Sequence, residues 1–115
     1  MAITNSDPDI SRKQQAERML DTLGLAAHRY GYLYLCLLIP RFAEDFRASL
    51  TKDLYPYAAA YYGYSDWRPI ERAIRDLIIS AWLNRDPEVW AEFFPNQRKP
   101  PSNKQFIAAL AKKLR

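Results

Sequence analysis

Charged side chains line one face of a helical segment near the middle of the chain, between about residues 66 and 82. The apolar residues of this segment recur at intervals of three and four and share one face: Trp67, Ile70, Ala73, Ile74, Leu77, Ile78, Ala81 and Trp82. The other face carries Arg68, Glu71, Arg72, Arg75 and Asp76. Helix-turn-helix proteins place an amphipathic helix of this kind in the major groove of DNA. The segment is therefore a candidate recognition helix.

A second helix is expected directly before it. Residues 50–62 are rich in alanine and tyrosine, and Pro56 lies close enough to their start to be tolerated in a first helical turn. Residues 63–65, Gly-Tyr-Ser, break that helix and predict a turn of three residues. Ser65 or Asp66 can then cap the next helix. The pattern predicts a helix-turn-helix over about residues 50–82.

Two other interpretations of this region remain open. Helical hairpins with charged outer faces are common, and the charges could form a solvated face on which Glu71 pairs with Arg75. The aromatic rings around the turn could stack on unpaired bases and bind single-stranded nucleic acid or RNA, although packing between the helices explains them more simply. These rings belong to Tyr55, Tyr57, Tyr61, Tyr62, Tyr64 and Trp67.

The N-terminal half predicts two further helices. Residues 11–23 place apolar side chains at helical spacing, and Gly24 follows as a natural C-terminal cap. Another helix starts near Ala27 and continues to Ile39 or beyond, with Pro40 expected to force a kink or an early stop.

The C-terminal part predicts a short helix and a longer last one. Residues 87–94 suit the short helix, and three prolines mark the irregular stretch that follows. The last helix opens at Ser102 with a capping box that ends at Gln105. Its inner face is expected to bury Phe106, Ile107, Leu110 and Leu114.

The composition suits one compact helical domain. Of 115 residues, 49% are hydrophobic and only three are glycines, which leaves little room for tight hairpins. We therefore expect an all-α fold, with a disordered arm over residues 1–10 and a single helical domain over residues 11–115, in which the helix-turn-helix is the candidate DNA-binding part. Cys36 is the only cysteine, so it can form no intrachain disulfide, and its apolar neighbours predict that it is buried.

Several classes of function find no support in the sequence. The longest apolar run, residues 32–39, is far shorter than the about 20 residues that span a bilayer, and no segment resembles a signal peptide. We expect a cytoplasmic protein without a membrane partner. Because no glycine-rich phosphate loop, metal-spaced cysteine and histidine set or nucleophile motif is present, we expect neither an enzyme nor a cofactor.

The net charge of +4 comes entirely from the C-terminal stretch. Acids and bases balance over residues 1–65 and again over residues 66–86. Residues 87–115 hold two acids and six bases, namely Arg98, Lys99, Lys104, Lys112, Lys113 and Arg115. A basic tail of this kind suits a polyanion such as the DNA backbone, while the last three bases could instead only complement the dipole of a helix end.

Four runs of residues carry a family resemblance: AHRYGYLYL at 27–35, LYP at 54–56, IERAIR at 70–75 with Trp82, and PSNKQFIA at 101–108. Together they resemble the C-terminal effector domain family of stage zero sporulation protein A, a response regulator of endospore-forming bacteria. The resemblance covers roughly residues 18–115. It implies a six-helix fold, specific recognition of double-stranded DNA and regulation of transcription in sporulation, often by two domains arranged in tandem or as a homodimer.

The resemblance also implies roles for single residues. Glu71, Arg72 and Arg75 match the family's base-reading positions. Arginine can donate two parallel hydrogen bonds to a guanine edge, and glutamate can accept one from the amine of cytosine. Arg68 lies near enough to contact phosphate, and the basic C-terminus supplies Lys104, Lys112 and Lys113 as further phosphate contacts.

The family's regulator begins with a phosphorylatable receiver domain, for which 115 residues leave no room. We therefore expect no phosphorylation control within this chain. A free-standing paralogue, a regulator of a phage or mobile element, and an excised fragment all remain open.

Departures from the family support a rival function. Pro69 stands where the family has an arginine, and Asp76 stands where it has a histidine. The predicted recognition helix therefore has no net charge, and its non-specific attraction to DNA must come from elsewhere, with the C-terminal bases as the available source. The rival is a protein-interaction module of the same fold, which binds RNA polymerase or a full-length regulator and has lost specific DNA reading.

Overall fold

The computed structural model describes residues 8–114, and every regular element in this range is helical. The six α-helices are α1 (Pro8–Thr22), α2 (Tyr30–Glu44), α3 (Tyr55–Tyr62), α4 (Arg68–Leu83), α5 (Pro87–Phe93) and α6 (Asn103–Ala111). A short π-helical segment, η1 (Leu50–Leu54), leads directly into α3. The expected all-α, six-helix fold is confirmed.

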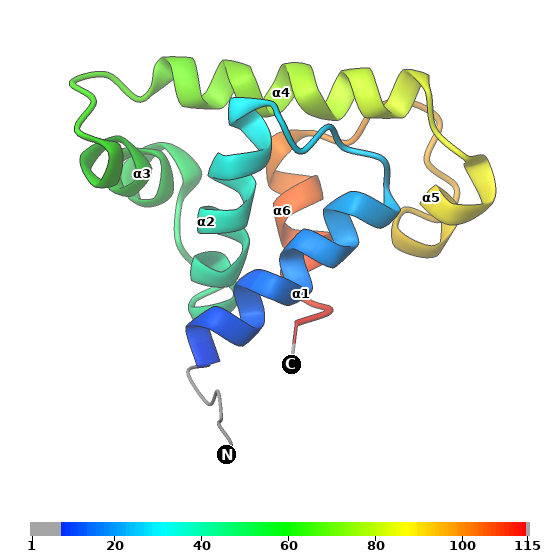
Figure 1. Ribbon diagram of the computed structural model, residues 1–115, viewed down its shortest axis with the longest axis horizontal. Coiled ribbons are helices and arrows are strands. Elements are labelled where there is room, and N and C mark those ends of the chain that lie inside the picture. Colours follow the sequence, from blue (N-terminus) through cyan, green and yellow to red (C-terminus); the bar gives the residue numbers. More distant parts are fainter. Residues whose placement is uncertain (1–7, 115) are drawn as a thin grey trace.

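The helices surround α2 in a compact arrangement (Figure 1). α4 lies along one side of the molecule, and α2 and α6 run away from it toward α1 on the opposite side. α3 and α5 lie near the two ends of α4. The C-terminal end of α6 therefore lies on the α1 side of the molecule, away from α4.

A continuous hydrophobic core joins the helices. Leu20 of α1, Leu38 of α2, Ile74 of α4 and Phe106 of α6 are all fully buried in it. The indole nitrogen of Trp90, on α5, donates a hydrogen bond to the carbonyl of Leu23, 3.0 Å away, which fixes α5 to the loop after α1. Burial of these side chains supplies the main stabilisation of the fold.

α2 and α4 touch at a glycine. A Cβ atom added to Gly31 would lie 2.6 Å from the carbonyl oxygen of Ala73 and 3.2 Å from Cβ of Leu77. Real Cβ atoms essentially never come that close to a backbone oxygen. Gly31 is therefore what allows α2 to approach the backbone of α4, and it sets the distance of α4 from the core.

The first helix differs from expectation at its start. α1 begins at Pro8 rather than at Ser11, so residues 8–10 are helical and do not belong to an irregular arm. The rest of the predicted arm, residues 1–7, lies outside the described residues. α1 ends at Thr22, and Gly24 follows with a left-handed φ of 83°, as expected for a helix that a glycine terminates.

The second helix differs at both ends. Residues 27–29 form a turn, so α2 starts at Tyr30 rather than near Ala27. Pro40 does not stop α2, which continues to Glu44. Ile39 and Phe42 are buried on either side of the proline, and we attribute its tolerance to this burial, which offsets the roughly 3 kcal/mol cost of an interior proline.

Several other predictions are confirmed. Cys36 is buried, and burial raises the pKa of its thiol to about 12. The capping box of α6 is complete, because the Ser102 hydroxyl accepts from the Gln105 N–H and the Gln105 side chain accepts from the Ser102 N–H. Within the described range, no helix is both long enough and apolar enough to traverse a bilayer.

Candidate nucleic-acid interface

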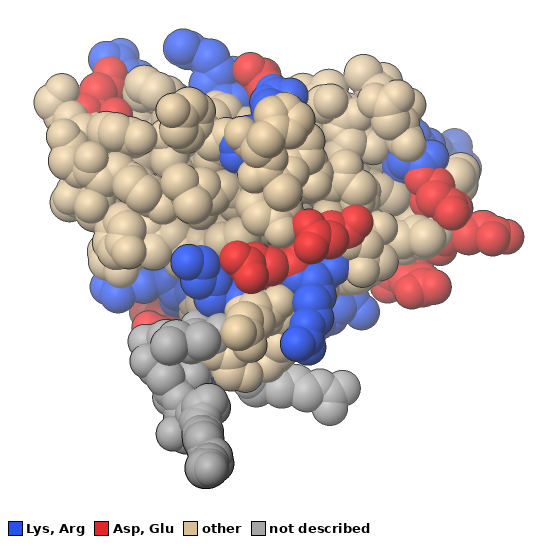
Figure 2. Space-filling model, in the orientation of Figure 1, with Lys and Arg blue, Asp and Glu red and all other residues tan. Residues whose placement is uncertain are grey.

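α4 separates apolar from charged side chains, as the sequence predicted. Its inner face is buried in the core through Ile70, Ile74, Leu77, Ile78, Ala81 and Trp82. On its outer face, Arg72, Arg75 and Asp76 are exposed and Glu71 is half-buried. Acidic and basic side chains both lie along the edge of the molecule that α4 forms, above a largely uncharged surface (Figure 2). The outer face is therefore available to a ligand and is mixed in charge.

The arginines of this face differ in their pairing. Within the part of the chain that the structure describes, Glu71 forms no ion pair with Arg75, so the expected alternative of an intrahelical pair is not formed. Arg68, in contrast, is held by Asp66: its Nε lies 3.1 and 3.2 Å from the two carboxylate oxygens, and its Nη2 lies 3.0 Å from Oδ2. Hydrogen bonds from Arg68 hold the pKa of Asp66 below its ordinary value. Arg72 and Arg75 are thus free to meet a ligand, while Arg68 is occupied.

The connection between α3 and α4 is longer than predicted. Five residues, 63–67, separate the two helices rather than three. Trp67 is the N-cap residue of α4, and its ring stacks on Tyr55 with centroids 5.3 Å apart. Asp66 accepts a hydrogen bond from the Arg68 N–H at 3.0 Å, so it satisfies one free amide of the first turn although it is not the N-cap itself. The helix begins only after the stacked tryptophan.

Tyrosines fix the turn onto α2. The hydroxyl groups of Tyr34 and Tyr64 lie 3.0 Å apart, and the ring of Tyr62 packs edge-on against Tyr34 at 5.5 Å. Gly63 has a φ of 76°, the left-handed conformation that ends α3. These contacts favour the simpler interpretation, that most rings near the turn serve packing. Tyr61 and Tyr64 are the most exposed of these rings, at 62% and 40% of their surface.

Asn103 joins three helical elements at one end of α4. Its Nδ2 donates to the backbone carbonyl of Glu71 on α4 at 3.1 Å and to Tyr55 Oη on α3 at 2.9 Å. This brings the start of α6 beside the first turns of α4, where Lys104 lines the same surface hollow as Glu71 and Arg75. The sequence predicted no role for Asn103, because its hydrogen bonds link positions 32 and 48 residues apart and no local pattern indicates them.

The predicted phosphate contacts fall in different places. Lys104 lines a hollow with Glu71 and Arg75, with its Nζ 5.8 Å from the centre of the Phe42 ring, while Arg68 lies at the start of α4. Lys112 is the C-cap residue of α6, and Lys113 follows it with Nζ 5.1 Å from the centre of the Phe93 ring. Since a helix rises 1.5 Å per residue, Lys112 lies about 13 Å along α6 from Asn103. Lys112 and Lys113 are therefore separated from the hollow that Glu71, Arg75 and Lys104 line.

No metal site accompanies this face in the described residues, which contain no group of three or more histidine, cysteine or carboxylate side chains placed to hold an ion.

Residues 16–114 match the family model described as the C-terminal domain of the sporulation initiation factor Spo0A. That family comprises DNA-binding domains that regulate transcription and is not a family of enzymes. The chain belongs to the family of C-terminal effector domains of the sporulation initiation factor Spo0A.

Proposed function

We propose that this protein is a sequence-specific regulator of transcription that reads double-stranded DNA with α4. The observation that carries the proposal is the pair of exposed arginines on the outer face of α4. Arg72 and Arg75 are exposed there and form no ion pair with a described carboxylate, while the inner face of the same helix is buried. A rigid helix with unpaired arginines on its outer side suits the major groove.

Three residues are proposed to read bases. Arg72 and Arg75 would each donate two hydrogen bonds to a guanine, and Glu71 would accept one from a cytosine amine. Each well-formed pair discriminates against the wrong base by about 1 to 3 kcal/mol. The Asn103 hydrogen bond to the Glu71 carbonyl supports this assignment, because it holds the backbone of the reading turn against α6.

Contacts to phosphate are proposed for fewer residues than the sequence suggested. Lys104 lies beside Glu71 and Arg75 and is the best placed. Arg68 would reach phosphate after leaving Asp66. The position of Lys112 and Lys113 at the other end of α6 does not favour contact with the same stretch of duplex, so the proposal leaves them out. With few phosphate contacts in one domain, we propose that two copies bind side by side on cytoplasmic DNA.

The test is a selection of binding sites from a randomised DNA duplex pool at low salt. The protein should enrich a sharp sequence motif, and the double variant Arg72→Ala, Arg75→Ala should enrich none. The matched control is Arg18→Ala, Arg47→Ala, which removes the same charge from two exposed arginines outside α4 and should enrich the wild-type motif.

The rival function predicts a different result. A protein-interaction module that binds RNA polymerase or a full-length regulator is favoured by the Asp76 carboxylate on the outer face of α4, which would repel phosphates. In that case the wild-type protein enriches no motif even at low salt, where weak phosphate contacts are strongest. That outcome would end the DNA-reading proposal.

A further inference from the structure

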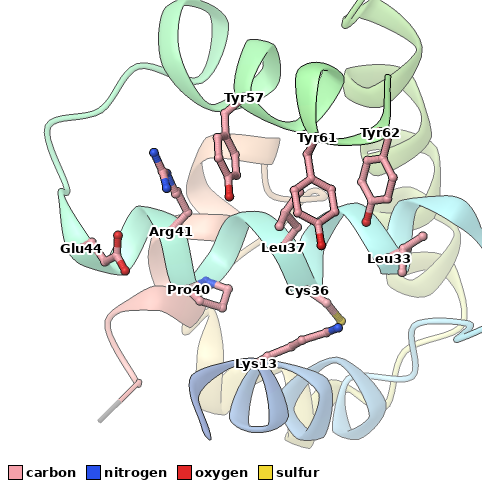
Figure 3. A pocket seen from close by; sticks show the side chains of 10 residues that line it. All are labelled: Lys13, Leu33, Cys36, Leu37, Pro40, Arg41, Glu44, Tyr57, Tyr61 and Tyr62. Carbon is pink, nitrogen blue, oxygen red and sulfur yellow. The ribbon is translucent and has the colours of Figure 1, made fainter. Parts of the chain in front are cut away.

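A groove between α1, α2 and α3 takes no part in the proposed reading of DNA. We call it the α1–α3 groove (Figure 3). None of the residues that line it belongs to α4 or α6: they are Lys13, Leu33, Cys36, Leu37, Pro40, Arg41, Glu44, Tyr57, Tyr61 and Tyr62. A partner in this groove would leave the outer face of α4 uncovered.

The walls of the groove are apolar and aromatic. α2 contributes Leu33, Leu37 and Pro40, and the tyrosine rings of α3 extend toward α2 across the opening (Figure 3). Leu33 is 42% exposed and Tyr61 is 62% exposed. Both side chains line the groove, so its mouth offers apolar surface that a partner could cover.

Two cations lie at the groove. The Arg41 guanidinium stacks over Tyr57, with its central carbon 3.9 Å from the ring centre, and Lys13 reaches from α1 toward Cys36 (Figure 3). Among the described residues, neither forms an ion pair with a carboxylate. Glu44, at the end of α2, is the single acid among the lining residues. Counted over the lining residues, two bases against one acid leave a net positive charge, which is complementary to an acidic partner.

The size of the groove limits what can enter it. Its cavity volume is about 170 Å³. Sites for whole small molecules usually enclose about 300 to 1,000 Å³. The groove thus has room for one large side chain, with the flanking chain lying across the opening.

We propose that the α1–α3 groove docks a short acidic and apolar segment of a partner protein. One apolar side chain of the segment packs on Leu37 and Pro40 beneath the tyrosines, and a neighbouring carboxylate contacts Arg41 or Lys13. The inference goes beyond the proposed reading of DNA and does not depend on it, because the groove and the outer face of α4 share no residue.

The test uses random peptides displayed on phage and selected against the full chain without DNA. We expect enrichment of peptides with a large apolar residue next to Asp or Glu. A synthetic peptide of that consensus should bind at least tenfold more weakly to Leu33→Glu and to Arg41→Glu. Matched controls are Leu83→Glu and Arg47→Glu, which place the same charges at exposed positions outside the groove and should bind like the wild type.

Other results would overturn the proposal. Selected peptides without an acidic and apolar consensus, or equal binding by Arg41→Glu and Arg47→Glu, would each do so. A dimer in sedimentation equilibrium that Leu33→Glu abolishes would assign the groove to a second copy of the chain. Peptide binding should also persist in the Arg72→Ala, Arg75→Ala variant, so loss of DNA reading and loss of docking are told apart.

Discussion

The side-chain amide of Asn103 donates a hydrogen bond to the backbone carbonyl of Glu71, 3.1 Å away. The same nitrogen also donates to the hydroxyl of Tyr55 at 2.9 Å. One side chain at the start of α6 thus joins α3 to the helix that carries the proposed reading residues. Because Glu71 is one of those residues, Asn103 ties the first turn of the proposed reading face to α6 and to Tyr55.

Replacing Asn103 should weaken both folding and DNA binding. Asn103→Ala removes both hydrogen bonds, and the free energy of unfolding should fall by about 1 to 3 kcal/mol. Affinity for the selected duplex should fall as well, because the first turn of α4 loses its support. Urea denaturation measures the first effect and fluorescence anisotropy measures the second.

Gln105→Ala is the control for Asn103→Ala. It removes the capping-box bond to the Ser102 N–H and leaves both Asn103 bonds in place. It should lower stability while the folded protein still binds DNA as the wild type does. Equal losses of DNA affinity in the two variants would show that Asn103 acts only through the stability of α6.

Gly31→Ala should displace α4. The new Cβ would lie 2.6 Å from the Ala73 carbonyl oxygen, so α2 and α4 must move apart. Overpacking of this kind costs about 1 to 3 kcal/mol. Gly24→Ala serves as the comparison, because Gly24 has a positive φ but open space around it, and only its backbone conformation is strained. We expect both variants to melt at lower temperature and only Gly31→Ala to lose DNA affinity when fully folded.

Asp66→Ala should strengthen binding to DNA by releasing Arg68. The freed guanidinium can contact a phosphate, so the slope of log K against log salt should steepen by about one unit of charge. Asp45→Ala is the matched control, since it releases Arg47 from a similar exposed pair away from α4. Identical salt slopes for the wild type and Asp66→Ala would contradict a phosphate contact by Arg68.

Cys36 should make the fold sensitive to high pH. Burial raises the pKa of its thiol to about 12, above the ordinary value of 9.0. The folded state therefore keeps its proton between these pH values while the unfolded state loses it, so the stability contributed by this group is complete below pH 9 and falls as the pH rises toward 12. Cys36→Ala should show a smaller loss in denaturation curves over this range. Iodoacetamide at pH 8 should alkylate Cys36 in urea and leave it unmodified in the folded protein.

Helical periodicity predicted α4 well, because the apolar residues that recur at intervals of three and four in that segment are the residues that the core buries. The capping box of α6 was equally predictable, because all its bonds lie within four consecutive residues. Boundaries were less predictable where distant residues decide them. α4 starts after Trp67, whose ring stacks on the distant Tyr55. α2 continues through Pro40, with buried side chains at Ile39 and Phe42 on either side of it.

The candidate site was predictable only in part for the same reason. The sequence placed Glu71, Arg72 and Arg75 on one outer face, and the structure agrees. It could not show that Asp66 occupies Arg68, that Asn103 reaches Glu71, or that Lys112 and Lys113 lie at the far end of α6 from Lys104. Each of these depends on how helices meet, which no local pattern encodes.

The central claim is that Arg72 and Arg75 read bases, and its most direct test combines protein and DNA variants. Affinity is measured for the wild type, Arg72→Ala and Arg75→Ala on the selected duplex and on every single base-pair change of it. We predict that each variant loses about 1 to 3 kcal/mol on the selected duplex and loses discrimination at one guanine only. A uniform loss across all duplexes, with every base preference kept, would contradict the claim and assign both arginines to the phosphate backbone.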